Sequence, residues 1–173
     1  MRHAQINGER LFRNLMALGR IGEDAGGGVT RLSMTKEDLA AREWLYKHME
    51  ELELEVHTDP IGNVIGRWPG YDPDAPTVMT GSHIDTVRQG GRFDGALGVL
   101  GALEAVRTMK EFGFVPHCGI EVVSFTDEEG ARFANGLIGS KAMTGLLGKE
   151  ELAGLRDSAG IGYEKALRDA GFN

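Results

Sequence analysis

Residues 77–95 read TVMTGSHIDTVRQGGRFDG, and residues 119–130 read GIEVVSFTDEEG. Each stretch begins with a short apolar run of the β type, of which residues 77–80 are expected to be a buried strand, and then passes into histidine or acidic residues. Between them, residues 95–112 have one polar face on an otherwise apolar segment, which predicts a long helix. Strand, helix and strand in this order predict a right-handed βαβ unit whose two strands are parallel.

Further helices and strands are expected around this unit. Asn7 and Thr35 each precede apolar residues at helical spacing, so both are expected to cap helices. Residues 54–57 and 63–68 are predicted to be short strands joined by a turn, and residues 141–173 to be short helices broken by glycines. The fold class that follows is α/β, with part of a mostly parallel sheet flanked by helices.

Charge and composition exclude several kinds of partner. The formal net charge of −7 argues against binding to nucleic acid or to an anionic membrane. No apolar stretch approaches the ~20 residues of a membrane span. Cys118 is the single cysteine, so an internal disulfide is impossible and a reducing compartment is favoured. We therefore expect a cytoplasmic protein with no nucleic-acid partner and no membrane partner.

The first polar cluster, His83 and Asp85, follows the first predicted strand. Alternate side chains of an extended segment share a face, so these two point the same way. The imidazole can then bind a metal while the carboxylate accepts its second N–H and orients it, and Asp85 suits this orienting role. The alternative is a surface histidine beside a turn aspartate.

The other two clusters also allow two interpretations. Asp94 directly precedes the long helix, so it is either a metal ligand or a helix N-cap. Glu128 and Glu129 diverge at a strand end, so one can hold a metal while the other faces a bound water; alternatively they lie on a solvated loop. All clusters occur in order along one βαβ unit, at the end where α/β proteins form their sites, and this favours a metal site. His117 lies at the opposite end and is expected to be structural.

Three motifs carry a resemblance to a known family: GSHIDT at 81–86, GRFDG at 91–95 and DEEGARF at 127–133. They resemble the amidase, hydantoinase and carbamoylase branch of the zinc aminoacylase and carboxypeptidase superfamily, which includes allantoate amidohydrolase and N-carbamoyl-L-amino-acid hydrolase. The similarity extends to GVTRL at 28–32, to Asp59 with Gly62-Asn63, and to Gly139-Ser140-Lys141. It therefore spans nearly the whole chain.

The resemblance implies a site with two divalent metal ions, either zinc or manganese. In that arrangement His83 binds one metal, Asp94 bridges both, and Glu129 binds the second. Glu128 is the general base, and Asp85 belongs to the catalytic site beside His83. The implied substrates are N-carbamoyl amino acids, ureido acids and allantoate. The resemblance also implies a cis peptide after Asp94 and a homodimer of the full-length protein, whereas the substrate-binding residues remain unknown.

The chain departs from the family pattern in its length. Similar proteins continue through an inserted lid and dimerisation domain and contribute two more histidine ligands, whereas this chain has no histidine after His117. Residues 1–173 are therefore expected to be the N-terminal portion of a zinc-exopeptidase-like metallohydrolase catalytic domain, truncated and without the lid. One hypothesis is a fragment of a dinuclear amidohydrolase that is inactive alone. The other is a non-catalytic remnant that binds one metal weakly or associates with another chain through its unfinished sheet.

Overall fold

The computed structural model describes residues 4–172, so residues 1–3 and 173 of the expected domain lie outside the described part of the chain. The described helices are α1 (Gly8–Gly19), α2 (Lys36–Glu50), α3 (Ala96–Glu111), α4 (Ile138–Met143), α5 (Lys149–Gly154) and α6 (Tyr163–Asp169). The strands are β1 (Glu55–Thr58), β2 (Val64–Trp68), β3 (Val78–His83) and β4 (Ile120–Phe125).

The four strands form one sheet in the order β1-β2-β4-β3. β3 and β4 are parallel and are connected through α3, which is the predicted βαβ unit. β1 pairs antiparallel with β2, and β2 pairs antiparallel with β4. The α/β class with flanking helices is confirmed, but the sheet is mixed. The short turn between β1 and β2 allows only an antiparallel pair, because a parallel pair needs a longer crossover.

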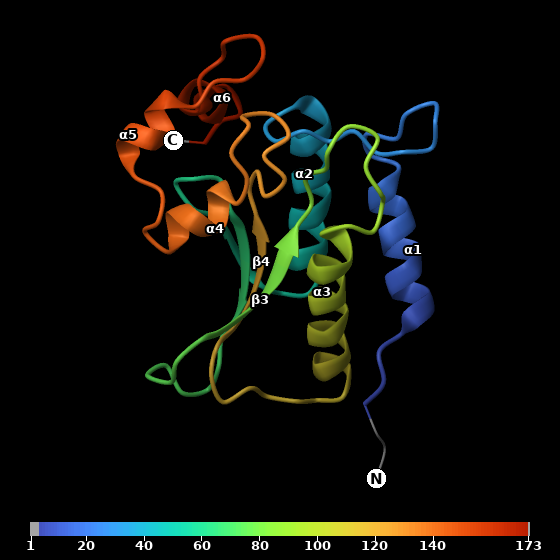
Figure 1. Ribbon diagram of the computed structural model, residues 1–173. Coiled ribbons are helices and arrows are strands. Elements are labelled where there is room, and N and C mark those ends of the chain that lie inside the picture. Colours follow the sequence, from blue (N-terminus) through green and yellow to red (C-terminus); the bar gives the residue numbers. More distant parts are fainter. Residues whose placement is uncertain (1–3, 173) are drawn as a thin grey trace.

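Helices cover both faces of the sheet. Figure 1 shows α1, α2 and α3 on one side, and α4 to α6 on the other side and toward the end at which β3 and β4 point. Val64 and Val122 pack into the core formed with α1, α2 and α3, and the next residues, Ile65 and Val123, are buried as well and point to the opposite face. A second cluster around Tyr163 packs α6 against Phe133 and Ile138.

Two of the expected helix caps are present. The Asn7 side chain accepts a hydrogen bond from the Arg10 N–H at the start of α1. Thr35 accepts one from the Asp38 N–H at the start of α2. In both cases the side-chain oxygen satisfies an N–H that has no partner within the helix, so local sequence decides where these helices begin.

β3 lies at the edge of the sheet rather than in its interior. We expected residues 77–80 to be a buried strand, but Val78 is 54% exposed and Met79 is 39% exposed. Within residues 4–172, β4 is the one strand that pairs with β3, so β3 has no strand on its outer side. The apolar run correctly indicated a strand, but its burial depends on a neighbour on the outer side.

None of the helices in residues 4–172 combines the length and apolar character that a bilayer crossing requires. The expected cytoplasmic location stays a prediction.

Asn63 connects three elements near the end of the sheet where the polar clusters lie. Its buried side chain accepts a hydrogen bond from the Thr126 N–H just after β4, and it donates to the Gly139 carbonyl in α4 and to Asp59. A Cβ at Gly139 would lie 2.1 Å from the Asn63 Oδ1, so glycine is required for this approach. Asn63 thus fixes the loop that leads from β4 to Glu128 and Glu129.

We predict that Asn63→Ala lowers the free energy of unfolding by about 1–3 kcal/mol, because it leaves the buried Thr126 N–H unpaired and removes the hydrogen bonds to Gly139 and Asp59. Urea unfolding monitored by circular dichroism measures the change. The matched control is Asn135→Ala, which removes an exposed hydrogen bond to Glu151 and a half-buried one from Lys141, and it should change the free energy by less than about 1 kcal/mol. Equal effects of the two substitutions would contradict the role given to Asn63.

Candidate metal centre

The three predicted metal ligands come together at one end of the sheet. His83 is the last residue of β3, Asp94 lies just before α3, and Glu129 follows β4. Each offers one ligand atom, and these atoms all lie within 4.8 Å of one another. The parallel pairing places His83 opposite Phe125, so the segments that follow the two strands leave the sheet at the same edge. The structure brings these residues together as predicted, while their role as ligands stays a prediction.

The His83 imidazole is buried and held by the main chain. Its Nδ1 lies 3.0 Å from the Asp85 main-chain oxygen and 3.6 Å from the Asp85 carboxylate. Its Nε2 lies 3.3 Å from a carboxylate oxygen of Glu128. If Nδ1 carries the proton, the Asp85 main-chain carbonyl fixes this tautomer as well as a carboxylate would. The lone pair of Nε2 is then available to bind a metal.

The Asp85 carboxylate has a different partner from the one expected. Its two oxygens accept hydrogen bonds from the main-chain N–H groups of Glu128 and Glu129, each at 3.2 Å. Asp85 is 2% exposed, so these bonds are shielded from water. The expected positioning role therefore extends to the double-glutamate segment, and the contact with His83 is made mainly through the Asp85 main chain.

Asp94 is available as a ligand because it does not cap α3. The N-cap is Gly95, and no side chain accepts a hydrogen bond at that helix start. A Cβ at Gly95 would lie 2.4–2.5 Å from three atoms of the His83 ring, so only glycine lets the imidazole approach this closely. The peptide after Asp94 is trans, as are all peptides of the described residues, so the implied cis peptide is wrong.

Negative charge accumulates around these residues. Burial, together with the nearby Asp94 and Glu128, raises the pKa of Glu129. Burial also raises the pKa of Asp85 to about 6. A cation between the carboxylates would relieve this repulsion, and one imidazole with two carboxylates is a donor set that zinc and manganese both accept. The residues present therefore fit a divalent metal ion.

The other described histidines lie away from this cluster. His117, which we expected to be structural, stacks on Tyr71 with ring centroids 4.9 Å apart, in the loop before β4. His48 stacks on Trp44 within α2. Within residues 4–172, the cluster thus contains a single histidine.

Asp127 and Arg31 are two buried charged residues to which the sequence patterns assigned no role. Asp127 has φ of +47° directly before Glu128, and neither of its buried carboxylate oxygens has a hydrogen-bond partner. Burial and the nearby Asp85 and Asp38 raise the pKa of Asp127 to about 8.

Arg31 is 1% exposed and lies beside the segment that follows His83. No periodic sequence pattern identifies either residue, because the burial of a charged side chain depends on how distant parts of the chain pack.

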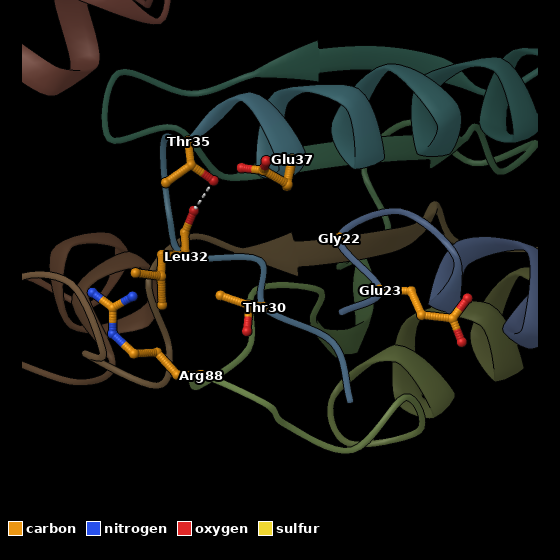
Figure 2. A pocket seen from close by; sticks show the side chains of 7 residues that line it. All are labelled: Gly22, Glu23, Thr30, Leu32, Thr35, Glu37 and Arg88. Carbon is orange, nitrogen blue, oxygen red and sulfur yellow. Dashed lines mark hydrogen bonds between the residues drawn. The ribbon is translucent and has the colours of Figure 1, made fainter. Parts of the chain in front are cut away.

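A surface cavity of about 320 Å³ lies between the segment that follows α1 and the start of α2. Figure 2 shows Thr30, Leu32 and Arg88 around it, with the Thr35 hydroxyl donating to the Leu32 carbonyl. None of its lining residues is a predicted metal or catalytic residue. The cavity therefore identifies no substrate-binding residue.

We predict that Asp127→Asn changes how stability depends on pH. Below about pH 4 the Asp127 carboxyl binds its proton in both the folded and the unfolded chain; as the pH rises toward 8 only the folded chain retains it, so the free energy of unfolding falls. Asparagine tolerates the left-handed conformation and does not ionise. The variant should therefore exceed the wild type by about 2–5 kcal/mol at pH 8 and by much less at pH 4.

Urea unfolding at pH 4, 6 and 8 measures this difference. The control Asp74→Asn changes the same charge on an exposed loop and should follow the wild-type profile. Parallel profiles for the wild type and Asp127→Asn would contradict the prediction.

Three comparisons place the chain among known proteins. The family model described as Peptidase family M28 matches residues 63–157. The chain is 52% identical over 168 residues to an N-carbamoyl-L-amino acid amidohydrolase of Geobacillus stearothermophilus, covering 97% of this chain and 41% of that protein. It is 41% identical over 155 residues to an allantoate amidohydrolase of Bacillus subtilis, covering 90% of this chain and 38% of that protein.

The fold also matches solved structures. A hydantoinase/carbamoylase family amidase from Burkholderia ambifaria superposes with a TM-score of 0.95 at 40% identity, over 99% of this chain and 42% of that one. These matches confirm the resemblance to the hydantoinase/carbamoylase amidases. The chain spans about two fifths of the length of the relatives it matches.

Proposed function

The chain belongs to peptidase family M28, and from this premise we propose that it carries part of the catalytic site of a metal-dependent amidohydrolase. The reaction is hydrolysis of a non-peptide C–N bond in an N-carbamoyl-L-amino acid, a ureido acid or allantoate. The names of the relatives support this substrate class. The observation that carries the proposal is the convergence of His83, Asp94 and Glu129 within 4.8 Å.

Two divalent ions, zinc or manganese, are the proposed cofactors. His83 would hold one ion, Glu129 the other, and Asp94 both. Bound metal ions lower the pKa of a water molecule and polarise the carbonyl or amidine that is attacked. The imidazole nitrogen and carboxylate oxygens at this site are ligands of the kind that such ions accept.

Glu128 is the proposed general base. Its carboxylate is half-buried and lies 3.3 Å from the His83 Nε2, so it faces the ligand cluster from the same loop as Glu129. It would accept a proton from the attacking water and deliver it to the departing nitrogen. Asp85 supports this role, because it binds the main-chain N–H groups of both glutamates and thereby fixes their direction.

The described residues supply at most two protein ligands per metal, whereas catalytic zinc sites usually have three. We therefore propose that the 173-residue chain is inactive alone and that the remaining ligands come from sequence present in the longer relatives. We further propose a cytoplasmic, homodimeric full-length protein: the single cysteine favours a reducing compartment, and the resemblance implies the homodimer. The alternative function is a non-catalytic chain that binds another chain along the exposed edge of β3, where Val78 and Met79 are accessible.

We predict that a full-length protein containing this chain releases ammonia from N-carbamoyl-L-amino acids or allantoate with added zinc or manganese. Glu128→Gln should lower kcat by about 10²–10⁴-fold, because it removes the base, while the metal content stays unchanged. The control Glu150→Gln, on exposed α5, should retain activity. Clear turnover by the 173-residue chain alone would refute the divided site, and full activity of Glu128→Gln would refute the assignment of the base.

A further inference from the structure

We propose that Arg31 is a positioning residue of this site: its buried guanidinium fixes the main chain between His83 and Asp85, and through Asp85 it sets the direction of the Glu128–Glu129 segment. The functional part of this inference rests on the proposed metal site. The structural part, the connection from Arg31 to the two glutamates, can be tested separately.

The hydrogen bonds of the Arg31 guanidinium, made through Nε and Nη1, all go to main-chain carbonyls. Its Nε donates to the Ile84 carbonyl at 2.6 Å, and its Nη1 donates to the carbonyls of Leu18 at 3.1 Å and Ile21 at 2.7 Å. The last two carbonyls lie at the C-terminal end of α1, where the helix dipole favours a positive charge. Arg31 therefore joins the end of α1 to the residue between His83 and Asp85.

Burial of the Arg31 cation is unfavourable in free energy, so its position here calls for a structural reason. Arg31 is 1% exposed, and burial lowers the pKa of its guanidinium. A buried charge whose hydrogen bonds go only to neutral carbonyls is a poor source of stability compared with an apolar side chain of similar size. This unfavourable burial occurs at the point where the guanidinium fixes the path of residues 84–86.

The Arg31 main chain holds the same segment from its other end. The Arg31 N–H donates to the Thr86 hydroxyl oxygen, and the Thr86 N–H donates to the Arg31 carbonyl, both at 2.9 Å. β3 ends at His83, so residues 84–86 lie beyond the sheet ladder. Arg31 thus bonds the residues on both sides of Asp85 where no neighbouring strand does.

Asp85 passes this constraint to both halves of the cluster. Its main-chain oxygen lies 3.0 Å from the His83 Nδ1, and its carboxylate accepts hydrogen bonds from the N–H groups of Glu128 and Glu129. A shift of residues 84–86 would move the imidazole and release the glutamate segment together. The three predicted functional residues that meet Asp85 therefore depend on an arginine that contacts none of them.

The test uses Arg31→Lys in a full-length protein that contains this chain. A lysine ammonium keeps the charge but cannot reproduce the fork that reaches three carbonyls. The control is Leu45→Ala, a core substitution in α2 that lowers stability without contact to the site. Amide hydrogen exchange at Glu128 and Glu129 is measured without metal, and cobalt(II) is then used as the metal probe, read by its affinity and its visible absorption spectrum.

We expect Arg31→Lys to lose exchange protection at Glu128 and Glu129, to bind cobalt(II) about 10–100-fold more weakly and to change its spectrum. Leu45→Ala should keep the wild-type spectrum and affinity even where its urea midpoint is lower. If Arg31→Lys does not fold, Thr86→Val provides the second variant, since it removes the hydroxyl bond from the other side of Asp85 and should also reduce protection at Glu128 and Glu129.

The possible outcomes separate the two proposals. Wild-type exchange protection and a wild-type cobalt spectrum in Arg31→Lys would overturn the role of Arg31, as would equal losses in Leu45→Ala. A wild-type full-length protein that binds no cobalt(II), while Arg31→Lys still loses protection at Glu128 and Glu129, would refute the metal site and support the structural connection.

Discussion

The site depends on the parallel pairing of β3 with β4. This pairing sets His83 opposite Phe125, so the segments after both strands leave the sheet at one edge. It brings Asp85 to the N–H groups of residues that lie 43 and 44 positions further along the chain. α3 makes the crossover between the two strands, and the residue before its first turn is Gly95, which lets the His83 ring lie against the main chain beside Asp94. An antiparallel arrangement would have placed these clusters at opposite ends of the sheet.

Stability and function are distributed unequally over this molecule. The side of the sheet covered by α1, α2 and α3 contains an apolar core that includes Leu18, Leu45 and Val122. The edge where β3 and β4 end contains buried charged groups instead, among them Arg31, Asp85 and Asp127. Such groups stabilise little and can destabilise, so the apolar core has to compensate for them. Unsatisfied or strained polar groups that gather at one end of a sheet are typical of functional sites.

The exposed edge of β3 is important because the chain spans only part of the length of its relatives. The chain superposes closely on a hydantoinase/carbamoylase family amidase but covers only 42% of it. The candidate ligand cluster contains one histidine within the described residues, and β3 is an edge strand whose first half, around Val78 and Met79, is exposed. Both features support the proposal that this chain contributes one part of a catalytic site. If the proposed ligands bind a metal, an arrangement in which Arg31 and Asp85 already hold them in place would limit the ordering that metal binding requires.

The sequence by itself determined the features that depend on near neighbours along the chain. These are the capped starts of α1 and α2, the order of strand, α3 and strand, and the polar clusters at His83, Asp94, Glu128 and Glu129. Only the tertiary structure decided that the sheet is mixed, that β3 is exposed at its edge, that the Asp85 carboxylate binds the glutamate main chain, and that Arg31 supports residues 84–86. The physical reason is that caps and periodicity act within a few residues, whereas the partner of a buried polar group and the cover of a strand depend on strand order and on contacts between distant parts of the chain.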